Sequence, residues 1–304
     1  MPVTDASYIV MLLFHLALYN KIVNALSLIS SGKRGKCTQL ETISACSLRR
    51  LSIQSLKSGF TTARLIKQHT VISTDHMTPE IKLHLITPLC ELWTASADNI
   101  PFHDPFWAFY WPGGQAIARY ILDNPQLMLG QHVLDVGSGS GACAIAAVKS
   151  GALSVTANDI DPVAATAIKM NAALNAVNID VCTENLVGKC CVKWNCILLG
   201  DMVYDAEFTG QLLKWLNAIR CKGKLVLLGD PGRQALKDIT ENCLTEVARY
   251  RLPKNACLEN RGFTDASVWS KQPIMAALMQ LQFKFRSAAN HTRHLILAPK
   301  HLGS

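Results

Sequence analysis

The chain has 304 residues, of which 49% are hydrophobic and 17% charged, a composition typical of a folded globular protein. Its formal net charge is +8, but residues 33–72 contain eight basic residues and one acidic residue, and residues 1–31 sum to zero. Residues 73–304 therefore retain a charge of only +1, which removes the main argument for a nucleic-acid-binding protein.

The eleven cysteines and nine histidines show no metal-site pattern, because the chain contains neither a C-x-x-C nor an H-x-x-x-H pair. Scattered thiols without a pairing pattern are typical of a reducing compartment. We therefore expect no metal ion.

An apolar run of eleven residues occupies positions 9–19. A helix needs about twenty apolar residues to span a bilayer, so we expect no stable membrane insertion. Asp5 precedes the run and no basic residue does, which is the wrong polarity for a signal peptide.

Residues 37–70 are rich in Ser, Thr, Arg and Lys and contain one acidic residue, Glu41. This composition predicts a mitochondrial presequence, although a presequence normally begins at the N-terminus; the alternative is a disordered basic arm. We predict that residues 1–72 form a largely disordered leader with a transit peptide, and that the protein is in the mitochondrial matrix, with the cytoplasm as the alternative.

We predict one domain over residues 73–273, with ordered structure beginning near Thr78. Thr78 is suited to cap a helix with Pro79 in its first position, and the following leucines and isoleucines would give that helix an apolar side. Residues 274–304 form a tail to which we assign no function.

A dense aromatic run at 104–111 is followed by Pro112, two glycines and a predicted helix at 115–122. Core packing explains some of these rings. The glycines beside Trp111 favour a surface that borders a ligand, so Trp111 is a candidate binding residue.

A glycine-rich turn joins a short apolar strand at 133–136 to a helical stretch at 143–149. Gly137, Gly139 and Gly141 allow the backbone to turn sharply and to approach a ligand. Asp159 follows the next strand, where a carboxylate can accept hydrogen bonds from both ribose hydroxyls. These features predict a nucleoside site; a glycine turn without a ligand is the alternative.

Strands and helices alternate along the rest of the chain, which predicts a doubly wound, mostly parallel α/β sheet with ligands at the carboxyl ends of its strands. The last two strands have little helix between them and suit an antiparallel hairpin at one edge. The predicted strands are 133–136, 153–157, 179–182, 194–199, 225–228, 246–252 and 266–270. The predicted helices that connect them are 143–149, 162–175 and 211–219.

Asp201 ends the fourth predicted strand, next to the glycine turn in this topology. A carboxylate there can accept a hydrogen bond from an amine and orient its lone pair. Tyr204 can supply a ring face to a cation. The alternative is that Asp201 caps the next helix, for which Asp205 is better placed.

The glycine turn with Asp135 in its strand, the acidic segment at 157–162 and Asp201-x-x-Tyr204 together resemble the protein lysine methyltransferases of the seven-strand class. The aromatic run and Gly-Asp-Pro-Gly-Arg at 229–233 narrow the resemblance to the mitochondrial family that modifies lysines of the β subunit of electron transfer flavoprotein. The resemblance covers roughly residues 77–273.

This resemblance implies a Rossmann-like class I methyltransferase that uses S-adenosyl-L-methionine, and the flavoprotein β subunit as protein partner. It implies that Asp201 and Tyr204 serve the target lysine; we also expect a monomer. The cofactor-binding candidates are Trp111, Asp135, Gly137, Ser138, Gly139, Gly141, Asp159 and, for the adenine, Asn185.

Three alternatives stay open. One is a different acceptor, either a ribosomal protein or a small amine, and another is a protein that binds the cofactor and clamps a partner without catalysis. A nicotinamide-dependent oxidoreductase is disfavoured, because the glycines read G-x-G-x-G and not G-x-G-x-x-G.

Overall fold

The computed structural model describes residues 59, 61–95, 100–220, 224–236, 244–259 and 262–270. The apolar run at 9–19, most of the predicted leader and residues 274–304 lie outside the described residues. What we expect of those segments therefore stays a prediction.

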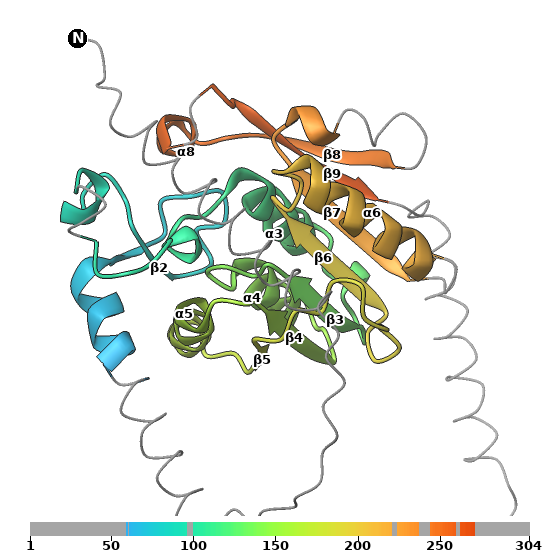
Figure 1. Ribbon diagram of the computed structural model, residues 1–304, viewed down its shortest axis with the longest axis horizontal. Helices are drawn as coiled ribbons and strands as arrows, with labels where there is room; N and C mark the ends of the chain where they lie inside the picture. The colour runs from blue at the N-terminus through green and yellow to red at the C-terminus, as the bar shows by residue number, and fades with distance from the viewer. Residues whose placement is uncertain are drawn as a thin grey trace, which may run out of the picture.

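Seven strands form one mixed sheet in the order β5-β4-β3-β6-β7-β9-β8 (Figure 1). Strands β3 to β7 are mutually parallel, whereas β9 is antiparallel to both β7 and β8. The strands are β3 His132–Val136, β4 Ser154–Asn158, β5 Asp180–Cys182, β6 Cys196–Gly200, β7 Leu225–Asp230, β8 Thr245–Arg251 and β9 Asp265–Ser270. The predicted doubly wound sheet with an antiparallel edge hairpin is confirmed.

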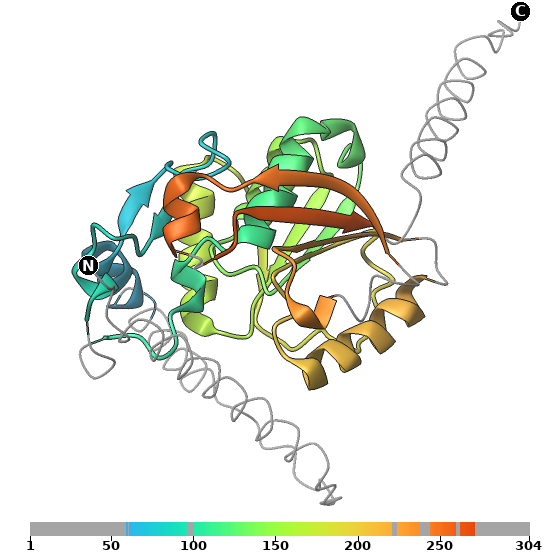
Figure 2. The same cartoon turned by 90° about the horizontal axis from the view of Figure 1, so that it is seen from above.

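Helices cover both faces of this sheet. The core of one face includes residues of α3 (Pro112–Asp123), α4 (Ala142–Lys149) and α5 (Pro162–Leu174), and the core of the other includes residues of α6 (Ala206–Arg220). Figure 2 shows α3 and α6 on opposite sides of the strands. Because both faces are covered, the central strands are continuous apolar runs, as parallel strands usually are.

The remaining elements are short. They are the 3₁₀ helices η1 Glu91–Trp93, η3 Phe106–Ala108 and η4 Pro125–Leu127, and the helix α8 Lys254–Glu259. At the start of α6, the Asp205 carboxylate accepts the N–H of Phe208 at 2.8 Å. Asp205 therefore caps this helix, as expected, and leaves Asp201 for another role.

Ordered structure begins earlier than we predicted. Residues 61–69 are helical, and β1 (Val71–Ser73) pairs with β2 (Leu83–Leu85). Ile66 is 0% exposed and packs in a cluster that includes Trp107. The prediction that ordered structure begins near Thr78 is wrong. It relied on the average composition of a basic segment, which does not reveal that a single apolar residue, Ile66, reaches the core.

The helix predicted from Thr78 is also wrong. Leu83–Leu85 form strand β2, which pairs with β1, and all three residues of β2 are buried. Thr78 is itself buried, and its hydroxyl lies 3.1 Å from the Tyr110 hydroxyl instead of capping a helix. Leu89, predicted on the apolar side, is 89% exposed.

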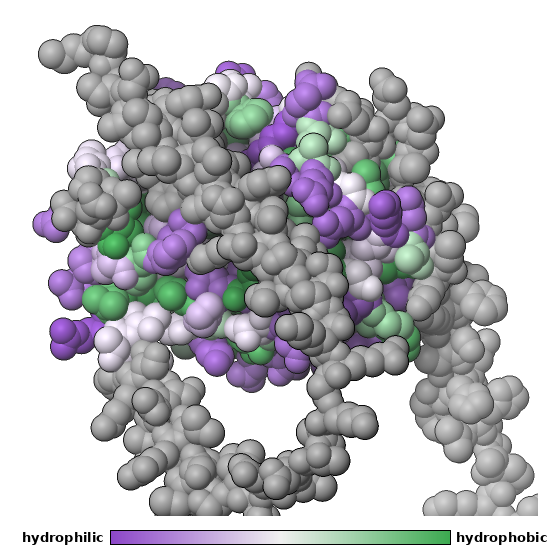
Figure 3. All heavy atoms as spheres, in the orientation of Figure 1, coloured by the Kyte–Doolittle hydropathy of each residue, from purple (hydrophilic) through white to green (hydrophobic). Residues whose placement is uncertain are grey.

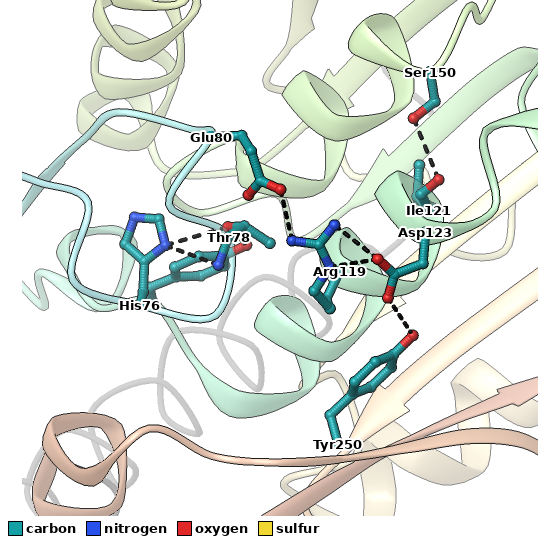
Figure 4. Close-up of polar contacts among 9 residues, drawn as sticks. His76, Thr78, Glu80, Arg119, Ile121, Asp123, Ser150 and Tyr250 are labelled. Atoms are coloured by element: carbon teal, nitrogen blue, oxygen red, sulfur yellow. Dashed lines mark hydrogen bonds and ion pairs between the residues drawn. The ribbon is translucent and has the colours of Figure 1, made fainter.

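Arg119 of α3 joins the N-terminal segment to the sheet edge (Figure 4). Its guanidinium pairs with Glu80 and with Asp123, each at 2.8 Å, and the Tyr250 hydroxyl of β8 donates to Asp123 at 3.2 Å. These partly exposed pairs fix where three segments meet and contribute little stability individually.

The exposed large hydrophobic side chains among the described residues are scattered: Ile72, Leu89, Leu129, Leu153, Ile160 and Val192. On the face shown in Figure 3, hydrophilic and hydrophobic residues are intermixed. Single exposed apolar residues are normal on a protein surface. A pocket, and not a surface patch, is therefore the first candidate for function.

Candidate functional site

A pocket with about 340 Å³ of empty space, part of it open to solvent, lies at the carboxyl ends of β3 and β6. This is the position where open α/β sheets bind ligands. The residues that line it are Phe109, Tyr110, Trp111, Gly114, Asp135, Gly137, Ser138, Gly139, Ser140, Ala142, Cys143 and Gly200.

The three predicted glycines form the turn between β3 and α4. Gly137, Gly139 and Gly141 all have positive φ, at 64°, 54° and 83°. A Cβ on Gly137 would collide with the Met202 sulfur, whereas at Gly139 the nearest atom is the Trp107 Cα at 3.7 Å. The turn thus needs glycine for its backbone conformation at all three positions and for close packing at Gly137.

Asp135 lies in β3 beside the pocket and is buried. Its carboxylate accepts hydrogen bonds from the Ser138 hydroxyl at 2.5 Å and from the Ala144 N–H at 3.1 Å. Burial raises the pKa of Asp135 to about 7. The predicted residues Asp135 and Ser138 are therefore brought together, and each holds the turn in place.

Asp159 follows β4 and is hydrogen-bonded to the same turn. Its two oxygens accept the N–H groups of Gly139 at 2.9 Å and Asp161 at 3.0 Å. Burial raises its pKa to about 6. Asp159 thus ties the end of β4 to the glycine turn, although it is not among the residues that line the pocket.

Asp201 directly follows Gly200, a pocket residue, and its φ of 56° is in the left-handed region. The residue is 8% exposed. One carboxylate oxygen accepts the N–H of Gly114 in the first turn of α3 at 2.9 Å, and the other accepts from the Arg233 guanidinium at 2.5 Å. The helix N-terminus and the guanidinium both favour a negative charge here.

The two glycines after Pro112 have a packing role. A Cβ on Gly113 would collide with the backbone of Gly229 at the end of β7, and one on Gly200 would press on Gly114. Because these four positions carry no side chain, the first turn of α3 lies directly on the ends of β6 and β7. This contact places the Gly114 N–H within reach of Asp201.

The aromatic run divides between core and pocket. Trp107 is 2% exposed and packs edge-on against Phe102, with ring centroids 5.3 Å apart. Trp111 lines the pocket, and its indole N–H donates to the Phe106 carbonyl at 3.0 Å. Phe109, 6.0 Å from Trp111 between ring centroids, also lines the pocket.

Tyr204 and Asn185 lie outside the pocket lining. The ring of Tyr204 stacks on Phe208 with centroids 5.4 Å apart, and burial raises the pKa of its hydroxyl above the usual value. Asn185 is exposed, and its side-chain oxygen accepts the N–H of Val187 at 3.1 Å. The structure therefore places Tyr204 in an aromatic stack and Asn185 in a surface turn.

Several site residues escaped the sequence reasoning. Arg233 pairs with Asp201, and the Gly-Asp-Pro-Gly-Arg motif alone predicts no role for this arginine. Cys143 lines the pocket, and its thiol contacts the Gly114 carbonyl at 3.3 Å. Burial raises the pKa of Cys143 well above the usual value, so it is a packing residue and not a thiolate. The position of Cys143 at the start of the helix after the glycine turn was the available clue.

Neither a metal cluster nor a membrane-crossing helix is found in the part of the chain that the structure describes. No group of three or more His, Cys, Asp or Glu residues there is arranged to hold a metal ion. None of the helices there is both long and apolar enough to cross a membrane.

The strand order, the glycine turn after β3 and the carboxylates in β3 and directly after β4 and β6 define a Rossmann-like class I methyltransferase. The family model for ribosomal protein L11 methyltransferase (PrmA) matches residues 120–196. A solved ribosomal protein L11 methylase from Lactobacillus delbrueckii subsp. bulgaricus is 26% identical and covers 53% of this chain and 80% of its own, but its TM-score of 0.38 adds no further support.

Curated relatives are more similar. The electron transfer flavoprotein beta subunit lysine methyltransferase of Xenopus laevis is 46% identical over 236 residues, which are 76% of this chain and 96% of the relative. The Homo sapiens protein of the same name is 45% identical over 206 residues, which are 67% of this chain and 79% of that protein. The chain belongs to the electron transfer flavoprotein beta subunit lysine methyltransferase family, and it is a methyltransferase.

Proposed function

We propose that the protein transfers methyl groups from S-adenosyl-L-methionine to lysine side chains of the electron transfer flavoprotein β subunit. The observation that carries this proposal is the match to relatives of that name, which spans 96% of the Xenopus laevis protein. The position of Asp201 at the carboxyl end of β6, next to the pocket, agrees with a catalytic role.

The pocket residues fit the methyl donor. At Gly139 only one atom lies within 4 Å of where a side chain would begin, so a flat ligand can approach the turn. We assign the pocket residues Trp111, Asp135, Gly137, Ser138 and Gly139 to the donor, together with Gly141, Asp159 and Asn185, which lie outside the pocket lining. When bound, S-adenosylmethionine supplies a methyl group that is electrophilic because it is attached to a positively charged sulfur.

Asp201 and Tyr204 are assigned to the target lysine. A free lysine ammonium has a pKa of about 10.4, so it must lose its proton to water before its nitrogen can react. The Asp201 carboxylate would accept a hydrogen bond from the amine and align the nitrogen lone pair with the methyl carbon. The new C–N bond forms as the C–S bond breaks, and the bonding electron pair leaves with sulfur.

The decisive measurement is the intact mass of recombinant electron transfer flavoprotein after incubation with the full chain and S-adenosylmethionine. We expect the β subunit to gain mass in steps of about 14 Da, and the Asp201→Ala variant to add little or none. An unmodified β subunit in the presence of active cofactor binding would refute the proposed substrate. Full activity of Asp201→Ala would refute the role of Asp201 alone.

A ribosomal protein is the second candidate acceptor, because the PrmA family model matches residues 120–196. Ribosomal protein L11 in a parallel incubation distinguishes the two acceptors. Methylation of L11 with an unmodified β subunit would favour this second candidate.

The basic composition of residues 37–70 supports a location in the mitochondrial matrix. We also propose that the enzyme acts as a monomer. Light scattering should then give a mass close to that of the 33.3 kDa chain, less any removed leader.

A further inference from the structure

The carboxylate of Asp201 is held from two sides. The backbone N–H of Gly114 reaches one oxygen at 2.9 Å, and the Arg233 guanidinium reaches the other at 2.5 Å. The Asp201 side chain is 6% exposed and that of Arg233 is 18% exposed. Hydrogen bonds between charged groups are stronger at such a buried position than in water.

Arg233 is itself fixed by the loop that precedes it. One oxygen of Asp230 accepts the N–H groups of Gly232 and Arg233, both at 2.7 Å, and the other accepts from the Arg233 guanidinium at 2.9 Å. The guanidinium also lies over the Phe263 ring, 5.7 Å from its centroid. The Gly-Asp-Pro-Gly-Arg segment therefore sets the position of Arg233 before any substrate arrives.

The cluster of Asp201, Asp230 and Arg233 contains two carboxylates and one guanidinium. With both carboxylates ionised its net charge is −1, which suits a site that receives a cationic amine. Burial raises the pKa of Asp230, and the Arg233 charge opposes that rise. Loss of Arg233 would leave two buried carboxylates near each other without a counter-charge, and the Asp201 carboxylate, then held only by the Gly114 N–H among the described residues, would turn away.

We propose that Arg233 is a positioning residue for methyl transfer, which rests on the proposed role of Asp201. It holds one oxygen of the Asp201 carboxylate, so that the carboxylate keeps one orientation toward the incoming lysine amine. A misplacement of a catalytic group by about 1 Å can cost about 100-fold in rate. Arg233 thus acts on the rate of transfer and not on the affinity for the methyl donor.

The test compares Arg233→Ala, Arg233→Lys and the control Arg249→Ala in the full chain. Arg249 suits the control because its side chain is 63% exposed and pairs with Glu246 on β8. We expect Arg233→Ala to lower kcat about 10- to 100-fold. The affinity for S-adenosylhomocysteine, measured by calorimetry, should change less than about twofold; Arg233→Lys should recover part of kcat, and Arg249→Ala should match the wild type.

A double-mutant cycle separates positioning from an independent effect. In the Asp201→Asn background, the further change Arg233→Ala should cost little, because the group it positions is already altered. The proposal would be overturned if the losses of kcat in the two single variants multiplied in the double variant. An unchanged or raised kcat in Arg233→Ala would overturn it as well. If Arg233→Ala does not fold, Arg233→Lys enters the same cycle.

A crystal structure of Arg233→Ala tests the proposal without an activity measurement. The Asp201 side chain should rotate away from its place beside Gly114, and an unmoved carboxylate would overturn the proposal. A wild-type enzyme that leaves the flavoprotein unmodified would refute the proposed function, and this structure would still decide whether Arg233 positions Asp201.

Discussion

Burial changes the pKa of individual acidic residues around the pocket. Asp135 has the same carboxyl group as any aspartate, but burial raises its pKa from 3.8 to about 7. It keeps two donors, the Ser138 hydroxyl and the Ala144 N–H, that partly offset the cost of its charge. This position is therefore one where stability and protonation are coupled.

The first prediction concerns the pH dependence of stability. The pKa of Asp135 is 3.8 in the unfolded chain and about 7 in the folded protein, so between these pH values the folded protein binds more protons at this residue. Asp135 therefore lowers the free energy of unfolding as pH rises from about 4 to about 7. Asp135→Asn cannot titrate. Relative to the wild type, its free energy of unfolding should rise by up to about 4 kcal/mol over this range.

Urea unfolding of both proteins from pH about 4 to about 8 provides the measurement. Asp180→Asn, which changes an exposed carboxyl group, is the matched control and should follow the wild type. Parallel pH curves for Asp135→Asn and the wild type would contradict the raised pKa of Asp135.

At the scale of elements, the close contact of α3 with β6 and β7 builds the site. Four glycines allow this contact, and two of them, Gly113 and Gly229, face each other. The same contact brings the Gly114 N–H to the Asp201 carboxylate across 87 residues of sequence. The position of the helix and the geometry of the carboxylate are therefore linked.

Gly113→Ala tests this link. The new methyl group would collide with the Gly229 backbone, so α3 must move, and we expect a loss of about 2–4 kcal/mol in the free energy of unfolding. Methyl transfer should fall as well, because the Gly114 N–H moves with the helix. Thermal or urea unfolding and the mass assay give the two readouts.

Gly210→Ala is the control for that substitution. Gly210 lies within α6, and among the described residues outside that stretch of helix no atom lies within 4 Å of its added Cβ. Alanine is the better helix former, so this variant should gain about 0.5–1 kcal/mol and keep full activity. Equal effects of the two substitutions would show that the contact between α3 and the strands is looser than described.

At the scale of the whole molecule, the N-terminal segment belongs to the folded domain. The helical residues 61–69 carry the fully buried Ile66, and β2 is attached to α5 through the Asn171 side chain, which accepts the His84 N–H at 2.8 Å. A leader removed at residue 72 would take Ile66 and most of β1 with it. The predicted leader must therefore end before residue 61.

This limit predicts the start of the mature protein. In cells, the full chain fused to a fluorescent protein should enter mitochondria, and the protein recovered from the matrix should begin before residue 61, as read by N-terminal sequencing. Replacing the basic residues at 33–57 by glutamine should abolish import. A cytoplasmic full-length chain would refute the targeting proposal, and a stable matrix protein that begins after residue 72 would refute the role of Ile66.

Local patterns explain why so much of the fold was predictable. The apolar runs of β3, β6 and β7, the G-x-G-x-G turn and the Asp205 cap each depend on residues close in sequence, and all were confirmed. The segment around Thr78 was not predictable in the same way, because leucines and isoleucines in a short apolar stretch suit a helix and a strand alike.

By itself, the sequence determined the class of fold, the glycine turn, the carboxylate in β3 and the carboxylates that follow β4 and β6, because strand, turn and helix preferences act over a few residues. Only the tertiary structure decided that Arg233 pairs with Asp201, that four glycines bring α3 onto the strands, and that residues 61–73 belong to the folded domain. These features join residues far apart in the chain. Their energy comes from burial and from charges placed beside each other, and neither exists until the chain has folded.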